Sequence, residues 1–141
     1  MNKLYSFIII LTFIITGCTP KVIEEDKLLK KIDSLDMNIY SKSGIKKYSI
    51  FTPYSIYDGI NDEFQFKKTT INIYKNGITR YIIISDESTL SDNNKFLELK
   101  GNVKLKTINE DDDYLYADNF TWNIDETNYV LTGNIRFENK N

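Results

Sequence analysis

A nine-residue pattern occurs twice in the sequence and constrains the fold more than any other feature. Residues 97–105 (LELKGNVKL) align without gaps on residues 129–137 (YVLTGNIRF), at an offset of 32 residues. In both copies apolar and polar residues alternate, so one face of an extended strand is apolar and the other is wet. A repeat of this period predicts stacked units. A glycine inside a strand costs stability, so Gly101 and Gly133 predict a bulge, a sharp bend or a passage between two sheets.

The same alternation of β-branched and aromatic residues continues through most of the chain beyond Met37. Pairs typical of turns interrupt it. Among them, Asn76-Gly77 predicts a type I′ hairpin, because both central residues of that turn take positive φ. Pro53 is expected to end the second strand. The predicted antiparallel strands are residues 38–42, 45–51, 63–75, 79–90, 95–108, 114–124 and 128–138, which make residues 37–141 an all-β domain with one apolar interior.

The first residues of the chain are typical of an export signal. Lys3 precedes an apolar run, Leu4 to Ile15, which leads into Thr16-Gly17-Cys18. The run is shorter than the roughly 20 residues of a membrane span, and it predicts a cleaved signal peptide over residues 1–17. The end of the run resembles the bacterial lipobox, so Cys18 is expected to carry a lipid. The alternative is an uncleaved anchor in which Cys18 is incidental.

Residues 18–36 are expected to link the lipidated cysteine to the domain. Leu28, Ile32 and Leu35 stand at helical spacing and predict a short amphipathic helix within residues 21–36. A helix of that length is marginal by itself, so partial disorder is the alternative. In either case the domain is expected outside the membrane that the chain is exported across.

The composition excludes several classes of function. The chain has no histidine, and Cys18 is its only cysteine, so the commonest general base and an intrachain disulfide are both missing. Cleavage before Cys18 leaves 124 residues with 17 basic and 20 acidic side chains, and no basic block long enough to follow a nucleic acid. Asp86 and Glu87 are adjacent on a strand and point to opposite faces, which argues against glycoside hydrolysis. We therefore predict no enzyme, no catalytic residue, no metal ligand and no cofactor.

Two conspicuous features have plain interpretations. The acidic segment 110–113 offers oxygen ligands for calcium, but it lacks the ordered spacing and the glycine of a calcium loop, which favours a solvated hairpin tip. The ten tyrosines suggest a carbohydrate surface, but on alternating strands they more often cover the faces of a sheet.

A set of short motifs adds a resemblance to a known family. In chain order these motifs are Tyr74-Lys75-Asn76-Gly77, Ile83-Ile84-Ser85-Asp86, Leu97-Glu98-Leu99-Lys100-Gly101-Asn102-Val103, Tyr116-Ala117-Asp118, Phe120-Thr121-Trp122-Asn123 and Leu131-Thr132-Gly133-Asn134-Ile135. Their order and spacing over residues 37–138 resemble LptC, the periplasmic component of lipopolysaccharide export, within the LptA/LptC/OstA-like group.

This resemblance implies an open antiparallel β-jellyroll, also called a β-taco, whose apolar groove receives the acyl chains of lipopolysaccharide or a related glycolipid. It implies an inner-membrane LptB/LptF/LptG-type transporter as one partner and an LptA-like protein, joined by β-strand addition, as another. The expected location is the periplasm, with the lipid anchor in a membrane, the inner membrane being favoured. The expected groove lining is Ile71, Ile73, Ile83, Leu97, Leu99, Val103, Leu105, Phe120, Trp122, Leu131 and Ile135.

Two features depart from that family pattern. Family members commonly keep an uncleaved transmembrane helix, whereas the apolar run of this chain ends in a lipobox. In addition, Thr19, not Asp, follows Cys18, so the sorting rule of enteric bacteria would not hold the chain at the inner membrane. The sequence also stops soon after Phe137, where the family's terminal strand docks LptA. The alternative function is a structural lipoprotein, or one that binds glycans or proteins, with a closed β-sandwich and no groove.

Overall fold

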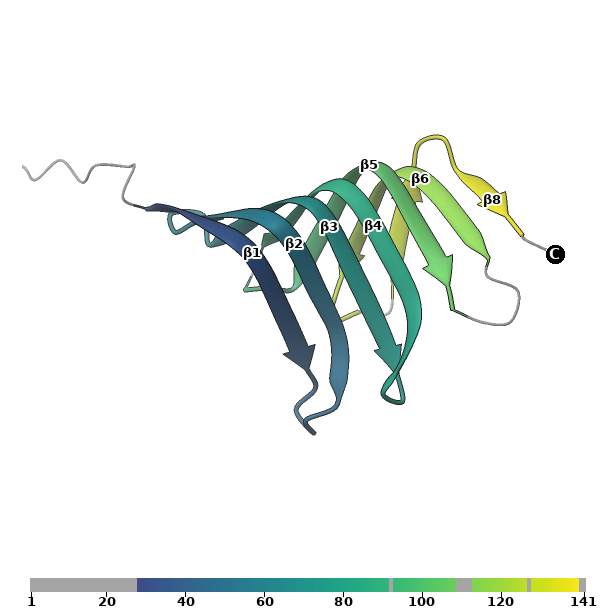
Figure 1. Cartoon of the computed structure of the whole chain (residues 1–141), viewed down its shortest axis with the longest axis horizontal. Coiled ribbons are helices and arrows are strands. Elements are labelled where there is room, and N and C mark those ends of the chain that lie inside the picture. The colour runs from purple at the N-terminus through teal and green to yellow at the C-terminus, as the bar shows by residue number, and fades with distance from the viewer. Residues whose placement is uncertain (1–27, 92, 109–112, 127, 140–141) are drawn as a thin grey trace, which may run out of the picture.

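The structure, a computed structural model, describes residues 28–91, 93–108, 113–126 and 128–139. Within these ranges all regular structure is β, and one antiparallel sheet contains all the strands (Figure 1). The strand order is β1-β2-β3-β4-β5-β6-β7, with β8 also paired to β6. The sheet is open, because β1 at one edge does not pair with β7 or β8 at the other. The strands are β1 (Leu29–Tyr40), β2 (Lys46–Asp58), β3 (Glu63–Lys75), β4 (Ile78–Ser91), β5 (Phe96–Thr107), β6 (Tyr114–Asn123), β7 (Tyr129–Thr132) and β8 (Arg136–Glu138).

This architecture confirms the expected all-β, open antiparallel fold. The hairpin at Asn76-Gly77 is also confirmed: Lys75 pairs with Ile78, and φ is 55° at Asn76 and 75° at Gly77. Positive φ at both central residues matches the right-handed twist of the two strands that the turn joins. The predicted signal peptide and Cys18 lie outside the described residues, and no helix in the described ranges is long and apolar enough to span a membrane.

Every long strand bends near its middle, along a line that we call the crease. The regular pairing of neighbouring strands is interrupted there, and several crease residues have positive φ. The bends fold the sheet into a trough (Figure 1). Buried Thr52, Ser55, Thr69, Ser85 and Ser88 flank the crease, where their small side chains let the two halves of the sheet approach. Along the sheet, the crease residues are Ser34, Pro53, Lys68, Asp86, Gly101-Asn102, Asp118 and Gly133-Asn134.

The crease divides the sheet into two wings. Wing A holds the parts of the strands next to the turns at residues 41–45 and 76–77. Wing B holds the parts next to the turn at residues 59–62. The final predicted strand, residues 128–138, crosses the crease as two short pieces: β7 pairs with β6 in wing B and β8 pairs with β6 in wing A.

The two copies of the sequence repeat form the same local structure at the crease. Asn102 donates from Nδ2 to Oδ2 of Asp86 at 2.6 Å, and Asn134 donates to Oδ2 of Asp118 at 2.8 Å. Each aspartate thus precedes its asparagine by 16 residues, and the two pairs are 32 residues apart. The glycine before each asparagine has positive φ and lies against the aspartate side chain. Of the expected alternatives, a bulge is found at Gly101, since β5 uses three residue steps from Lys100 to Val103 where β6 uses two. Gly133 lies where the chain breaks between β7 and β8.

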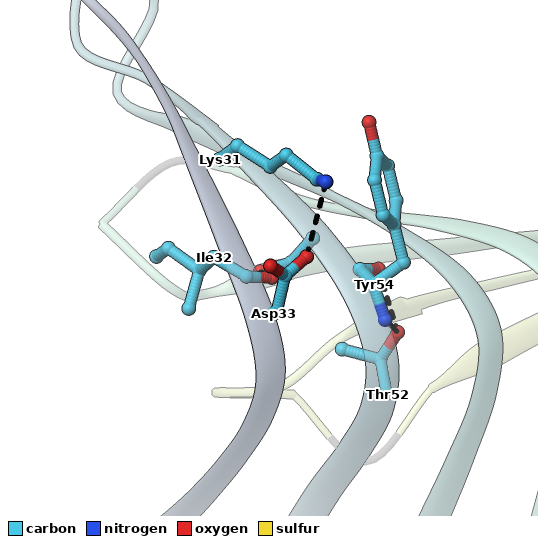
Figure 2. A network of polar contacts seen from close by, with 6 residues as sticks. Lys31, Ile32, Asp33, Thr52 and Tyr54 are labelled. Carbon is cyan, nitrogen blue, oxygen red and sulfur yellow. Dashed lines mark hydrogen bonds and ion pairs between the residues drawn. The ribbon is translucent and has the colours of Figure 1, made fainter.

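The expectation that Pro53 ends the second strand is wrong, because β2 passes through the crease to Asp58. The hydroxyl of Thr52 satisfies backbone groups that the bend takes out of the ladder. It donates to the carbonyl oxygen of Lys67 at 2.7 Å. It also accepts from the amide of Tyr54 at 3.2 Å (Figure 2). A proline is tolerated at this position because the ladder is already interrupted there.

The expected helix within residues 21–36 is wrong over the described part of that range, because Leu29–Tyr40 is strand β1. Ile32 pairs with Ser55 and Leu35 pairs with Thr52, so both lie opposite buried residues. Ser34, between them, has a φ of 59°. The bend at Ser34 shifts the alternation by one residue, which produces a three-residue spacing that imitates a helix.

The core lies inside the trough and extends from the crease into both wings. Ile50, Ile71 and Val103 come from wing A, and Leu97 and Leu99 from wing B; each is at most 1% exposed. Five further buried residues complete the cluster: Tyr48, Phe66, Ile83, Leu90 and Phe120. Near the crease the trough is therefore filled by the protein's own side chains.

Candidate functional site

The two wings touch farther from the crease through one aromatic pair. Tyr48 of β2 in wing A and Trp122 of β6 in wing B meet edge to face, with ring centroids 5.5 Å apart and an interplanar angle of 61°. Trp122 is further held by its indole N–H, which donates to the carbonyl oxygen of Glu126 at 3.3 Å. Tyr48 itself is 1% exposed. The pair forms part of the wall of an opening between the wings.

That opening is a cavity of about 580 Å³. On wing A its wall runs from β2 to β8, and on wing B it is formed by β6, β7 and the turn between them. Most of the wall is aliphatic or aromatic. The lining residues are Lys47, Tyr48, Ile73, Tyr74, Tyr81, Ile83, Leu105, Thr107, Asp113, Tyr114, Leu115, Phe120, Trp122, Ile124, Asp125, Glu126, Tyr129 and Phe137.

The charged lining residues lie at the ends of strands. Lys47 and Asp113 belong to wing A, while Asp125 and Glu126 follow the end of β6 in wing B. Asp125 is paired with Lys95 at 3.1 Å, and Asp113 accepts from Asn139 at 2.6 Å. The middle of the wall is formed by apolar groups such as Ile83 and Leu105. The arrangement suits an apolar guest.

The pKa of Tyr48 responds both to its burial in the cavity wall and to a carboxylate at the margin of the cavity. Burial raises the pKa of Tyr48 to about 12, and the carboxylate of Asp125 acts in the same direction. The Tyr48 hydroxyl therefore stays neutral at any physiological pH. Wing A thus presents an uncharged ring to the cavity at this position.

The structure brings about half of the predicted lining residues to the cavity. Ile73, Ile83, Leu105, Phe120 and Trp122 form part of its wall. Four of the others are fully buried in the core, and Leu131 packs against that core. Ile135, which lies between β7 and β8, is 58% exposed and lies outside the cavity wall. The four fully buried residues are Ile71, Leu97, Leu99 and Val103.

Sequence reasoning missed most of the aromatic part of the wall. Tyr48, Tyr74 and Tyr81 come from the hairpin-forming ends of wing A, and Tyr129 and Phe137 come from the second repeat. The alternation carried a signal for the last two, because they share their parity with Leu131. The tyrosines of wing A carried no comparable signal, since tyrosine is equally common on the outer face of a sheet.

The acidic side chains of the described residues are dispersed. The described residues contain no group of three or more acidic, histidine or cysteine side chains that would hold a metal ion. Asp86 and Asp118, each of which precedes one copy of the repeat, accept hydrogen bonds from asparagines on the crease. A bent sheet with an apolar cavity is equipped to hold a guest.

A family model for LptC, described as lipopolysaccharide assembly, LptC-related, matches residues 7–134 of the chain. The match covers the whole of β1 to β7. The chain belongs to the LptC family. No curated protein matches it.

Membership of the LptC family places the chain in lipopolysaccharide transport, as a periplasmic component of the cell envelope that works with other Lpt proteins. The LptC family is a transport component and is not known as an enzyme. The resemblance that the motifs between residues 37 and 138 carry is thus confirmed.

Proposed function

We propose that the cavity between the wings holds acyl chains of lipopolysaccharide or a related glycolipid as the lipid passes from an inner-membrane transporter to an LptA-like protein. The observation that carries the proposal is the apolar wall formed by Ile73, Ile83 and Leu105 on wing A and by Phe120 and Trp122 on wing B. Each methylene that leaves water there contributes about 0.8 kcal/mol. No covalent chemistry is required, because the burial of apolar surface holds the acyl chain reversibly.

The test uses two neighbouring positions on β5. A photo-crosslinking amino acid replaces Leu105, which lines the cavity, or Lys104, which points to the opposite face and is absent from the cavity wall. Both variants are expressed in cells and irradiated. Capture of glycolipid at position 105 and none at position 104 is the expected result. A folded, correctly located protein that captures no lipid at position 105 would reject the proposal.

The structure also favours a refinement of the route. Leu99 is fully buried near the crease, so an acyl chain would need to displace core side chains to reach it. The cavity wall includes the Tyr48 and Trp122 rings and does not include Leu99. A crosslinker at Leu99 would therefore perturb folding, whereas Leu105 reports on the open part of the trough.

We further propose that the two sheet edges receive the protein partners by strand addition. β1 offers twelve residues of edge, whereas β7 and β8 offer four and three on either side of Gly133-Asn134. A photo-crosslinker at exposed Asn38 on β1 is expected to capture a transporter subunit, and one at exposed Val130 on β7 an LptA-like protein. Ile84, exposed in the middle of the sheet on β4, is the matched control. Equal capture at all three positions would contradict edge pairing.

The lipid anchor remains part of the proposal. Cys18→Ser is expected to abolish incorporation of labelled fatty acid and to release the protein from the membrane fraction, while the sheet stays folded. Density fractionation of the unmodified protein then distinguishes the inner from the outer membrane. Retention of Cys18→Ser in the membrane, with the first 17 residues still attached, would instead indicate an uncleaved anchor.

One observation favours the alternative of a closed, structural lipoprotein. The inside of the trough is packed shut near the crease, where Ile50, Ile71 and Leu99 are 0% exposed. If the cavity between the wings also stays empty in cells, the crosslinker at position 105 captures no lipid, and a structural role becomes the better description.

A further inference from the structure

One aromatic contact fixes the spacing of the two wings at the cavity. Tyr48 on β2 of wing A and Trp122 on β6 of wing B meet edge to face, with ring centroids 5.5 Å apart, and both rings belong to the cavity wall. Their strands are not neighbours in the sheet, since β3, β4 and β5 lie between them. The contact therefore joins parts of the sheet that the hydrogen-bond ladder does not hold together.

Each of the two rings is also held from its own wing. Tyr48 lies opposite Ile73 on β3 and is 1% exposed. Trp122 lies opposite Leu97 on β5, and its indole N–H donates to the carbonyl oxygen of Glu126 at 3.3 Å. Because neither ring is a loose surface side chain, the pair resists separation of the wings as well as bounding the cavity.

The volume of the cavity limits the guest that fits while the two rings are in contact. The cavity measures about 580 Å³. A methylene group takes roughly the space of one water molecule, about 30 Å³, so the cavity has room for on the order of 20 such groups. That is one acyl chain of a membrane lipid and part of a second. A lipopolysaccharide carries several acyl chains, which need a wider opening.

We propose that the contact between Tyr48 and Trp122 determines how many acyl chains the cavity admits: while the rings touch, one chain fits, and a lipid with several chains enters only when they part. This inference rests on the proposed function, since it concerns the guest of the same cavity. An edge-to-face pair is weak enough for such a role. The burial of roughly two further methylene groups compensates for its loss.

Removal of the Tyr48 ring distinguishes a contact that restricts entry from a wall that only binds the guest. If the contact opposes entry, Tyr48→Leu removes it and leaves an apolar wall. The affinity for a lipid with several chains then rises by about two- to tenfold, which corresponds to the energy of one aromatic pair. If the ring only adds contact area, the same substitution lowers the affinity for every lipid.

Two further variants accompany this substitution. Tyr48→Phe keeps the ring, so the restriction on lipids with several chains should persist. Phe51→Leu removes an aromatic ring from the same strand, but that side chain is 45% exposed and does not line the cavity. Phe51→Leu is therefore the matched control and should leave the lipid affinities of the parent unchanged.

The emission of Trp122 reports on the guest, because it is the only tryptophan of the chain. The full chain is reconstituted into phosphatidylcholine vesicles, and dibrominated stearic acid, a probe with one chain, is added until it quenches the emission. Purified lipopolysaccharide then competes, and the recovered emission gives its affinity. In Tyr48→Leu, lipopolysaccharide should compete about two- to tenfold better than in the parent, whereas the affinity of the single-chain acid should stay nearly the same.

Weaker binding of both lipids in Tyr48→Leu, or equal behaviour of Tyr48→Leu and Tyr48→Phe, would overturn the inference and leave the proposed function intact. If neither lipid changes the emission of Trp122 in the folded parent, the cavity holds no lipid, and the proposed function and this inference fail together. Urea unfolding verifies that each variant is folded.

A second variant covers the case in which Tyr48→Leu does not fold. Trp122→Leu removes the same contact from wing B, and a photo-crosslinker at position 105 replaces the fluorescence measurement. Capture of glycolipid in cells is then expected to exceed capture by the parent with the same crosslinker. Capture that is unchanged or lower would overturn the inference.

Discussion

The rings of Tyr48 and Trp122 meet across the trough with their centroids 5.5 Å apart, although the two residues are 74 positions apart in the sequence. Tyr48 belongs to wing A and Trp122 to wing B, so this contact couples the two wings where the crease no longer holds them together. The opening of the cavity therefore depends on an aromatic pair as well as on the bend of the backbone.

A double-mutant cycle measures that coupling. Tyr48→Leu and Trp122→Leu, singly and together, are expected to show an interaction energy of about 0.5–1.5 kcal/mol in the free energy of unfolding. Urea denaturation provides the measurement. Phe64 and Tyr129 supply the control cycle. Their rings contact different residues, Tyr57 and Phe66 for Phe64 and Phe120 for Tyr129, so the effects of their substitutions on the free energy of unfolding should be additive. Additivity at Tyr48 and Trp122 as well would mean that the wings are not coupled there.

The Tyr48 hydroxyl makes stability depend on pH in the alkaline range. Burial raises its pKa from 10.0 to about 12, so the unfolded chain ionises first as the pH rises. The resulting stability is fully present below pH 10 and is lost as the pH rises toward 12. Absorbance titration should show one tyrosine ionising near pH 12, and Tyr48→Phe should remove that step and reduce the alkaline loss of stability. An unchanged titration curve in Tyr48→Phe would assign the step to another tyrosine.

The crease glycines should be far less tolerant of substitution than a turn glycine with the same φ. A Cβ on Gly133 would lie 2.8 Å from Cβ of Asp118, whereas a Cβ on Gly44 would have no neighbour within 4 Å. Both residues have positive φ, so Gly44→Ala measures the backbone cost alone, about 1 kcal/mol. Gly133→Ala is expected to cost at least about 2 kcal/mol, measured by thermal or urea unfolding. Similar costs for both variants would show that Asp118 moves aside freely.

The Thr52 hydroxyl should contribute more to the free energy of unfolding than its size suggests. Thr52→Val keeps the shape of the side chain but leaves the Tyr54 amide and the Lys67 carbonyl without this partner, at an expected cost of about 1–3 kcal/mol in unfolding free energy. Thr70→Val, on the same sheet but half-buried on β3, serves as the comparison and should change stability by less than about 0.5 kcal/mol. A Thr52→Val protein as stable as the parent would imply that water or a backbone shift satisfies both groups.

The sequence by itself determined that the chain beyond Met37 forms antiparallel strands, and it located several of the turns between them. Those features follow from local chemistry: alternation with a period of two defines a strand, and Asn76-Gly77 accepts positive φ where other residues do not. The limits of β3, Glu63–Lys75, and an interruption of regular strand geometry at Gly101 and Gly133 were predictable for this reason. The motifs of residues 74–135 also indicated the LptC family, because their order and spacing persist even where each motif is short.

Only the tertiary structure decided where the apolar faces meet. At the crease the alternation shifts by one residue, so Phe64 and Phe66 face inward with one parity and Ile71 and Ile73 with the other. The same shift between Ile32 and Leu35 imitated a helix. A local pattern cannot distinguish a bent strand from a helix, because both move the apolar residues out of the two-residue alternation. Here the pairing with β2 decides for the strand, since Ser55 lies opposite Ile32 and Thr52 lies opposite Leu35.

The position of the cavity likewise could not be predicted from the sequence. Leu99 and Leu105 have the same residue type, the same strand and the same parity, yet Leu99 is fully buried and Leu105 lines the opening. On β6, Leu99 pairs with Phe120 and Leu105 pairs with Leu115, so the difference lies in which side chains of the opposite wing cover each leucine. A pattern of one strand specifies which face is apolar, whereas the angle between two wings determines whether that face is packed shut or left open for a guest.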